Sequence, residues 1–214
     1  IIYSLFYDIL NSTQITAKEL FTDFNYDPEN ILSVRCNQQN NGIGTNGRSW
    51  VSPPDLNLYM TLGISFPSSF SQFLPLFPFF TTSVVHRILE KEYNLKSKLK
   101  WRNDILINSK KMTGVLCQSS GSSNDKYLSI FIGIGVNCNM EANGDLGSTS
   151  IKEETRRNVD IEHFYNLVLS EFDQEYHEFL KFPEGYSILL LDYFNNHLAF
   201  KNEIIEISNL STED

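Results

Sequence analysis

The chain has 214 residues, of which 41% are hydrophobic and 20% charged, and its formal net charge is −9 at pH 7. This length can hold one domain with an ample core, or one domain and a small appendage, and the composition is that of an ordinary soluble globular protein. The acidic balance argues against general nucleic-acid binding through a basic surface. An anionic ligand would therefore need basic residues gathered in one place.

The cysteines and histidines show no metal-binding pattern. The four histidines are scattered, and the three cysteines are widely spaced, with no C-x-x-C pair: Cys36, Cys117 and Cys138. We therefore expect reduced thiols and a cytoplasmic location, without a zinc site or a disulfide framework. The chain opens without a secretory leader, and its most apolar run, at 73–85, is too short to span a bilayer and contains two prolines.

Hydrophobic periodicity predicts a mixture of strands and helices. We expect strands at 2–10, 31–35, 56–66, 99–107, 112–118, 127–136 and 198–207. We expect helices from about 12 to 24, then at 75–93, 161–180 and 186–194. The turn at 108–110 predicts an antiparallel hairpin, and 141–150 is expected to be a loop. The apolar stripes of the helices are interpreted as core.

A glycine-rich loop is the first candidate site. Gly42, Gly44 and Gly47 are followed closely by Arg48 and Trp50. Such a loop lets the backbone approach a ligand, while a guanidinium and an indole suit an anion that carries an aromatic ring. A plain surface loop between two strands would explain the glycines equally well.

The predicted hairpin is the second candidate site. It gathers basic residues in an acidic chain: Lys96, Lys98, Lys100, Arg102, Lys110 and Lys111. An anionic substrate requires such a local positive field, although solvation alone explains Lys96, Lys98 and Lys110. Lys111 precedes an apolar strand and should have an anionic partner, because burying an unpaired charge is costly.

The first strand is followed by Ser12, Thr13 and Gln14. Ser12 or Thr13 could simply cap the next helix. Alternatively, the three side chains could bind a small polar group where the strand meets the helix. Both interpretations stay open at this point.

Taken together, the motifs resemble those of the biotin protein ligases. They are S-T-Q at 12–14, Gln39 with G-x-G-x-x-G-x-x-W-x-S-P at 42–53, K-W-x-N-D at 100–104, K-x-x-G-x-L at 111–116, G-x-G-x-N at 133–137 and S-I-K-E-E at 150–154. The resemblance covers about 2–194. It implies an α+β fold with a mixed, largely antiparallel sheet flanked by helices, similar to class II aminoacyl-tRNA synthetases. It also implies a catalytic domain at 1–196 and the incomplete start of a small C-terminal β-barrel at 197–214.

The resemblance implies a two-step ligase reaction. Biotin and ATP would form biotinyl-5′-AMP and pyrophosphate, and a lysine of a biotin carboxyl carrier domain, as found in biotin-dependent carboxylases, would then take the biotin. Mg²⁺ would be held largely by phosphate oxygens, so no protein ligand set is assigned. The winged-helix DNA-binding domain of some members is not found, so neither a repressor role nor nucleic-acid binding is expected.

The resemblance also assigns residues to roles. Lys111 and Arg48 would be catalytic. Biotin would be bound by Ser12, Thr13, Gln14, Gln39, Gly42, Ile43, Gly44, Thr45, Lys111 and Gly114. ATP would be bound by Arg48, Trp50, Lys100, Asn103, Asp104 and Asn137.

Three positions depart from the family pattern. Ile43 and Thr45 stand where basic loop residues are common, which predicts weaker retention of the adenylate, and Arg102 replaces a proline. Gln14 in place of asparagine is a mild change. The alternatives are a lipoate or octanoate ligase or transferase of the same superfold, and a ligase-fold binding protein that has lost catalysis.

Overall fold

The computed structural model describes residues 1–22, 29–121, 125–141 and 147–203. These residues form a seven-stranded sheet in the order β1-β2-β3-β7-β6-β5-β4. β1 and β2 run parallel, and every other neighbouring pair runs antiparallel. The strands are β1 (Ile2–Leu10), β2 (Ile31–Gln39), β3 (Leu58–Pro67), β4 (Lys98–Lys100), β5 (Asp104–Ile107), β6 (Lys110–Ser120) and β7 (Tyr127–Val136). The mixed, largely antiparallel sheet predicted from the sequence is confirmed.

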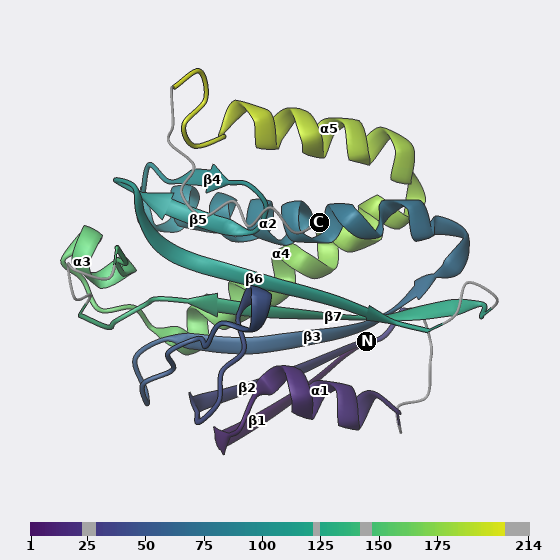
Figure 1. Cartoon of the computed structure of the whole chain (residues 1–214), viewed down its shortest axis with the longest axis horizontal. Coiled ribbons are helices and arrows are strands. Elements are labelled where there is room, and N and C mark those ends of the chain that lie inside the picture. Colours follow the sequence, from purple (N-terminus) through teal and green to yellow (C-terminus); the bar gives the residue numbers. More distant parts are fainter. Residues whose placement is uncertain (23–28, 122–124, 142–146, 204–214) are drawn as a thin grey trace.

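Helices pack on both faces of this sheet (Figure 1). They are α1 (Thr13–Thr22), α2 (Phe77–Tyr93), α3 (Ile151–Thr155), α4 (Ile161–Lys181) and α5 (Pro183–Asn196), with short 3₁₀ turns η1 (Thr45–Gly47) and η2 (Ser68–Leu76). α1 lies against β2, β3 and β7 on one face, while α2 and α4 cover the other and α5 packs on both of them. Among the described residues, no helix is long and apolar enough to cross a membrane.

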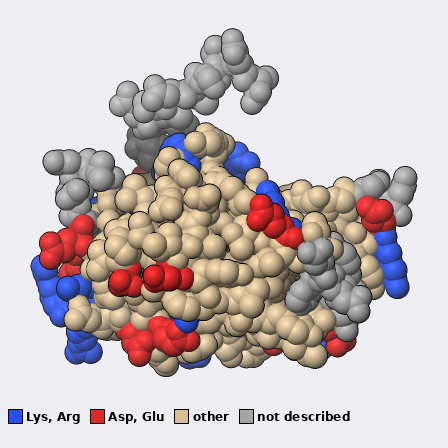
Figure 2. Space-filling model, turned by 90° about the horizontal axis from the view of Figure 1, so that it is seen from below, with Lys and Arg blue, Asp and Glu red and all other residues tan. Residues whose placement is uncertain are grey.

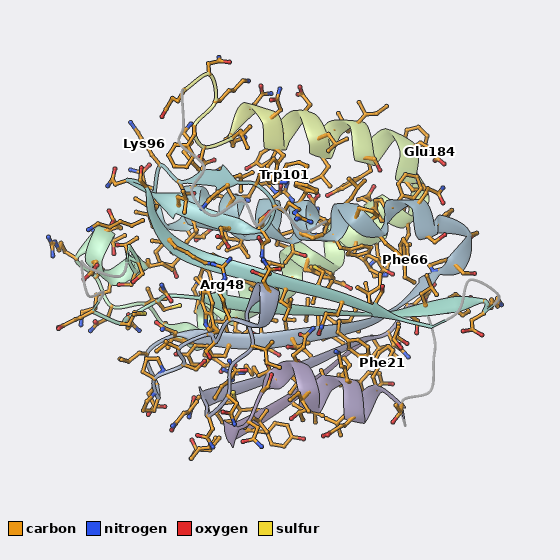
Figure 3. All side chains as sticks on the ribbon, viewed as in Figure 1. Phe21, Arg48, Phe66, Lys96, Trp101 and Glu184 are labelled. Atoms are coloured by element: carbon orange, nitrogen blue, oxygen red, sulfur yellow. The ribbon has the colours of Figure 1, made fainter. Side chains whose placement is uncertain are left out.

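Two hydrophobic cores separate these layers (Figure 3). In the larger core, Phe66 of β3 meets Phe77 of α2 edge to face at 5.1 Å and stacks on Phe179 of α4 at 6.1 Å. In the smaller core, Phe21 of α1 meets Phe131 of β7 edge to face at 5.3 Å. The helix stripes predicted to be core are therefore core, and they fix α1 and α4 on opposite faces.

The predicted strand at 99–107 is wrong in its centre. β4 and β5 are two short strands that pair with each other, and residues 101–103 form the turn between them. Trp101 and Arg102 are exposed at this turn, so they cannot continue a buried strand. Asn103 therefore lies in the turn, and Asp104 begins β5 instead of sitting within one long strand.

One other predicted strand is not formed, and a short helix lies where no element was predicted. The strand predicted at 198–207 is not formed in its described part, where Leu198 makes an isolated bridge to Leu99 and turns follow; the rest of that prediction lies outside the described residues. Residues 151–155 form α3, because the Ser150 hydroxyl caps the helix by accepting the Glu153 backbone N–H.

Strand β1 forms one edge of the sheet and exposes apolar side chains. Tyr3, Phe6 and Ile9 are 43%, 53% and 54% exposed. Figure 2 looks onto this edge, and uncharged atoms fill the middle of the view. Asp8 is the one charged residue of the strand, so this edge offers apolar side chains rather than a charge pattern.

Candidate active site

A cavity that is open to solvent lies on the face of the sheet that carries α1. Strands β6 and β7 form its floor, the start of α1 forms its closed end, and the loop 40–52 forms its outer wall. The lining residues are Ser12, Thr13, Gln14, Gln39, Ile43, Gly44, Thr45, Trp50, Met60, Thr61, Asn103, Lys111, Gly114, Val115, Leu116, Gly133, Ile134 and Gly135.

Three glycines give the floor its shape. Gly133 and Gly135 lie on the same side of β7, and Gly114 of β6 is paired with Gly135. A Cβ at Gly135 would lie 2.4 Å from the Trp50 ring, and a Cβ at Gly114 would lie 2.7 Å from it. A Cβ at Gly133 would lie 2.8 Å from Gln14 Oε1. The glycines are therefore required so that Trp50 and Gln14 can lie directly on the sheet.

The start of α1 closes one end of the cavity. The Ser12 hydroxyl accepts the backbone N–H of Gln14 at 3.2 Å, as a residue that caps a helix does. Ser12, Thr13 and Gln14 are 1%, 4% and 3% exposed, and all three line the cavity. Ser12 therefore caps the helix and also lines the cavity, and the binding of a small polar group by these side chains stays a prediction.

Thr61 of β3 joins the side chains at this closed end. Its hydroxyl lies 2.9 Å from Thr13 Oγ1 and 3.1 Å from Gln14 Oε1. Thr13 donates its backbone N–H and its hydroxyl to Gln39 Oε1, at 2.9 and 3.2 Å. Gln14 Nε2 donates to Gln118 Oε1 at 3.1 Å and to a backbone carbonyl of β7 at 3.2 Å. Hydrogen bonds thus hold these side chains in place without a ligand.

Hydrogen bonds within the protein use some, but not all, of the polar groups at the closed end, and the remaining donors and acceptors could bind a ligand. Gln14 donates both amide hydrogens within the protein, so its Oε1 keeps one free acceptor position beside Thr61. Gln39 donates one amide hydrogen to Ser52 and has a second one left. Among the described residues, none accepts the hydroxyl hydrogen of Ser12. Hydrogens of Ser12 and Gln39 and an acceptor position on Gln14 therefore remain, which suits a planar group with a carbonyl oxygen beside an N–H.

The loop 40–52 lies over the floor as a narrow hairpin. Trp50 N donates to Gly42 O at 2.8 Å, and Gly44 N donates to Arg48 O at 2.7 Å. Each bond joins the segment before η1 to the segment after it. These bonds bring the indole of Trp50 down onto β6 and β7. Arg48 follows η1 and is exposed in front of the sheet (Figure 3).

Lys111, at the start of β6, lies beside Trp50. Its Nζ is 2.7 Å from Asp104 Oδ1 on β5 and 5.3 Å from the centre of the Trp50 ring. The Lys111 side chain is 36% exposed, so the ammonium borders the open part of the cavity. Asp104 is an anionic partner of the kind that the sequence predicted for this lysine.

Asn137, at the end of β7, holds the backbone next to Lys111. Its Nδ2 donates to Thr149 O at 3.0 Å and to Lys111 O at 3.5 Å, and its backbone N–H donates to Met112 O at 2.9 Å. In addition, Lys111 N donates to the backbone carbonyl at 147, and Thr149 N donates to Lys111 O. Asn137 thus fixes the strand that carries the lysine.

Known proteins with similar sequences identify the family of this chain. The family model described as the Biotin/lipoate A/B protein ligase family matches residues 7–137. The chain is also 31% identical over 182 residues, 82% of its length, to the bifunctional ligase/repressor BirA of Bacillus subtilis. It belongs to the biotin/lipoate protein ligase family. The chain spans about half the length of the curated relatives that it matches, covering 54% of the B. subtilis protein.

Solved structures of ligases share the fold. The biotin protein ligase of Leishmania major in complex with biotin superposes with a TM-score of 0.76 at 24% identity, over 100% of this chain and 86% of that one. The biotin protein ligase of Aquifex aeolicus in complex with biotin and ATP gives a TM-score of 0.75 at 22% identity, over 92% and 78% of the two chains. The class II synthetase-like α+β fold expected from the sequence is therefore the ligase-family fold.

Most residues assigned to biotin or ATP from the ligase motifs come together at the cavity. Those that line it are Ser12, Thr13, Gln14, Gln39, Ile43, Gly44, Thr45, Trp50, Asn103, Lys111 and Gly114. Five others do not line it: Gly42, Arg48, Lys100, Asp104 and Asn137. Arg48 and Lys100 are exposed, Asp104 touches the cavity through Lys111, and Asn137 is occupied by backbone carbonyls. Their roles toward a ligand stay predictions.

Sequence reasoning assigned no role to several lining residues. These are Met60, Thr61, Val115, Leu116, Gly133, Ile134 and Gly135. Thr61 is the most informative, because it is a polar residue within the apolar run of β3, and that pattern could have singled it out. Its partner across the sheet is Gly133, a pairing that only the folded sheet reveals.

The cysteines are free thiols: Cys36, Cys117 and Cys138. Burial raises the pKa of Cys36 to about 11 and the pKa of Cys138 to about 12. Both thiols stay protonated at neutral pH, so neither is a candidate nucleophile.

Proposed function

We propose that this chain is a biotin–protein ligase. It joins biotin to AMP at the expense of ATP and then transfers biotin to a lysine of a biotin carboxyl carrier domain. The observation that carries the proposal is the unused hydrogen-bonding capacity of the closed end. Donors from Ser12 and Gln39 suit the urea oxygen of biotin, and the acceptor position on Gln14 suits a urea N–H.

Lys111 would meet the acid group of the same molecule. Gly133, beside Gln14, and Gly135, beside Trp50, are two residues apart on β7, about 7 Å along the strand. Gly135 is paired with Gly114, which lies beside Lys111. The ring would lie at the closed end, and the flexible tail would run along the glycine floor under Trp50. The carboxylate would then replace Asp104 as the anionic partner of Lys111.

In the first step a carboxylate oxygen of biotin attacks the α-phosphorus of ATP, and the bond to pyrophosphate breaks. The Lys111 ammonium lies between the two anions, lowers their repulsion and offsets the charge that develops in the transition state. Asn137 keeps Lys111 in place through its hydrogen bonds to the backbone carbonyls of Lys111 and Thr149. The protein needs no nucleophile of its own, in agreement with the protonated thiols.

Magnesium would enter with the nucleotide. Within the described residues, no cluster of three or more His, Cys, Asp or Glu side chains could hold a metal ion. Phosphate oxygens and water would therefore supply most of its ligands, and Mg²⁺ would neutralise phosphate charge. Of the predicted ATP residues, Trp50 and Asn103 line the cavity and would border the nucleotide, with Arg48 and Lys100 reaching it from the exposed loop and hairpin.

In the second step the lysine amine of the carrier domain attacks the carbonyl carbon of biotinyl-AMP, and AMP leaves. The open side of the cavity gives that lysine access. The named ligands of the L. major and A. aeolicus ligases, biotin and ATP, support this substrate pair. The free cysteines support a cytoplasmic location. We also propose 1–196 as the catalytic domain and 197–214 as the start of a further domain.

A matched pair of lysine variants tests the proposal. Purified protein is incubated with biotin, ATP, Mg²⁺ and a carrier domain, and biotin-dependent pyrophosphate release and carrier biotinylation are measured. Lys111→Ala should reduce both by about hundredfold or more, because a charge-assisted contact at the reacting atoms is lost. Lys110→Ala removes a neighbouring exposed lysine and should leave both unchanged. Wild-type protein that releases no pyrophosphate with biotin would contradict the proposal, and would favour a binding protein of the same fold.

A further inference from the structure

We propose that Ser52 is a positioning residue for the biotin ring, acting through Gln39. Ser52 is 6% exposed and does not line the cavity, so it cannot bind the ligand itself. The inference rests on the proposed function, because it names a residue that sets the affinity of the same site for its acid.

Ser52 uses both of its hydrogen-bonding capacities inside the protein. Its hydroxyl donates its one hydrogen to Trp50 O at 3.0 Å. Only acceptor positions then remain on Oγ, and Gln39 Nε2 donates to one of them at 2.9 Å. The nitrogen end of the Gln39 amide is thereby anchored to the loop that carries Trp50.

The oxygen end of the same amide is anchored separately. Gln39 Oε1 accepts both the backbone N–H and the hydroxyl of Thr13. Because both ends of the amide are held, its plane is fixed, and the second hydrogen on Nε2 can point in one direction only. Without Ser52 the amide could still accept from Thr13, but it could pivot about Oε1, and the donor for the urea oxygen would no longer be aimed.

Gly42 shows how tightly this contact is packed. A Cβ at position 42 would lie 2.3 Å from Trp50 O, 2.8 Å from Ser52 Oγ and 3.0 Å from Gln39 Nε2. The three atoms of the anchor thus converge on the space beside a glycine. This explains why position 42 carries no side chain although it is outside the cavity lining.

A double-mutant cycle tests whether Ser52 acts through Gln39. Biotin affinity is measured by calorimetry without nucleotide, and kcat and KM are measured for biotin and for ATP. Ser52→Ala should raise Kd and KM for biotin about five- to tenfold, as expected for one lost neutral hydrogen bond, with little change in kcat or in KM for ATP. Gln39→Ala should raise both biotin constants at least as much. Ser52→Ala in the Gln39→Ala background should then add no further loss.

Two controls keep the result interpretable. Ser187, a buried serine that donates to Pro183 O far from the cavity, gives the matched variant Ser187→Ala, which should leave biotin affinity unchanged. Ser52→Cys keeps a side chain of the same connectivity, with a larger and more weakly hydrogen-bonding atom, and replaces Ser52→Ala if that variant does not fold. Additive losses, a loss confined to kcat, an equal rise in KM for ATP, or unchanged biotin affinity would each overturn the inference. Wild-type protein that does not bind biotin would instead contradict the proposed function.

Discussion

The two ends of the cavity differ in how far they are formed without a ligand. At the closed end, Ser12, Thr13, Gln14, Gln39 and Thr61 are fixed by hydrogen bonds to one another and to the backbone. At the open end, Lys111 is paired with Asp104, and Arg48 and Lys100, which do not line the cavity, are exposed. The site for the acid should therefore be formed before the ligand binds, whereas the site for the phosphates should form only when they bind. For the proposed ligase, affinity for the acid would depend on buried neutral hydrogen bonds, and retention of the nucleotide product would depend on exposed charged side chains.

Of the substitutions that probe the difference between the two ends, the largest effect is expected where they share the glycine floor. Gly135→Ala would place a Cβ 2.4 Å from the Trp50 ring and push the indole into the cavity. Overpacking of this kind costs about 1–3 kcal/mol, so kcat/KM for biotin should fall by about ten- to hundredfold. The measurement is the biotin-dependent release of pyrophosphate.

The same experiment has an internal control. With Trp50→Ala present, Gly135→Ala should cause almost no additional loss, because the ring that it displaces is gone. Equal losses in both backgrounds would mean that the glycine floor does not act through Trp50.

The open end should respond to added charge. Ile43→Arg places a cation at a residue that lines the cavity, so release of biotinyl-AMP should slow by about tenfold or more, as one charge-assisted contact would predict. Val51→Arg puts the same charge at a 72% exposed position outside the lining and should change release little. Release of labelled adenylate from wild type that is already as slow as from Ile43→Arg would refute the weak retention predicted from the loop.

The closed end should respond to the loss of a single hydroxyl. Thr61→Val keeps the shape but removes the hydroxyl that lies within hydrogen-bond distance of both Thr13 Oγ1 and Gln14 Oε1, and we expect a rise of about tenfold in Kd for biotin with no change in KM for ATP. Thr113 is equally buried, and its hydroxyl has no hydrogen-bond partner among the described residues. Thr113→Val should therefore leave binding unchanged. Identical behaviour of the two valine variants would show that the Thr61 hydroxyl is not part of the site.

The smallest effect is expected on the other face of the sheet, and on stability alone. Burial lowers the pKa of His86 on α2 below its ordinary value, against opposing contributions from Ser97 O and Glu90 and further lowering by His197 and Lys98. Below about pH 6.5 the unfolded chain then binds more protons than the folded one, so stability falls as pH drops through that value.

Thermal unfolding between pH 5 and 8 measures this loss. His86→Gln should make the acid side of the profile shallower, although Tyr193, which bonds His86 Nδ1 at 2.8 Å, loses a partner and the variant starts less stable. His163 is exposed, so His163→Gln should retain the wild-type slope. Biotin affinity should be the same in all three proteins at pH 8.

Local patterns in the sequence predicted a good part of this molecule. Residue types at close spacing singled out the S-T-Q at 12–14, the glycine loop and Lys111. The fold brings all three to one cavity. The periodicity of β3, α2 and α4 was also sufficient to place the core. These features depend on interactions within one element or between neighbours, which a single sequence contains.

Other features depend on contacts between distant segments. That Thr61 lies next to Gln14 follows from the pairing of β3 with β7 and the docking of α1, which no local pattern encodes. Asn137 and Arg48 fit their motifs, but a motif does not say where a side chain points. The turn at 101–103 was missed because Trp101 is apolar by type and yet 65% exposed.

The most direct test of the central claim compares two acids that differ in their ring. Calorimetry without nucleotide should detect binding of biotin, and lipoic acid, whose ring carries no carbonyl or N–H, should bind about hundredfold more weakly or not at all, because it leaves the buried donors of Ser12 and Gln39 unpaired. Equal affinity for the two acids, or tighter binding of lipoic acid, would contradict the account.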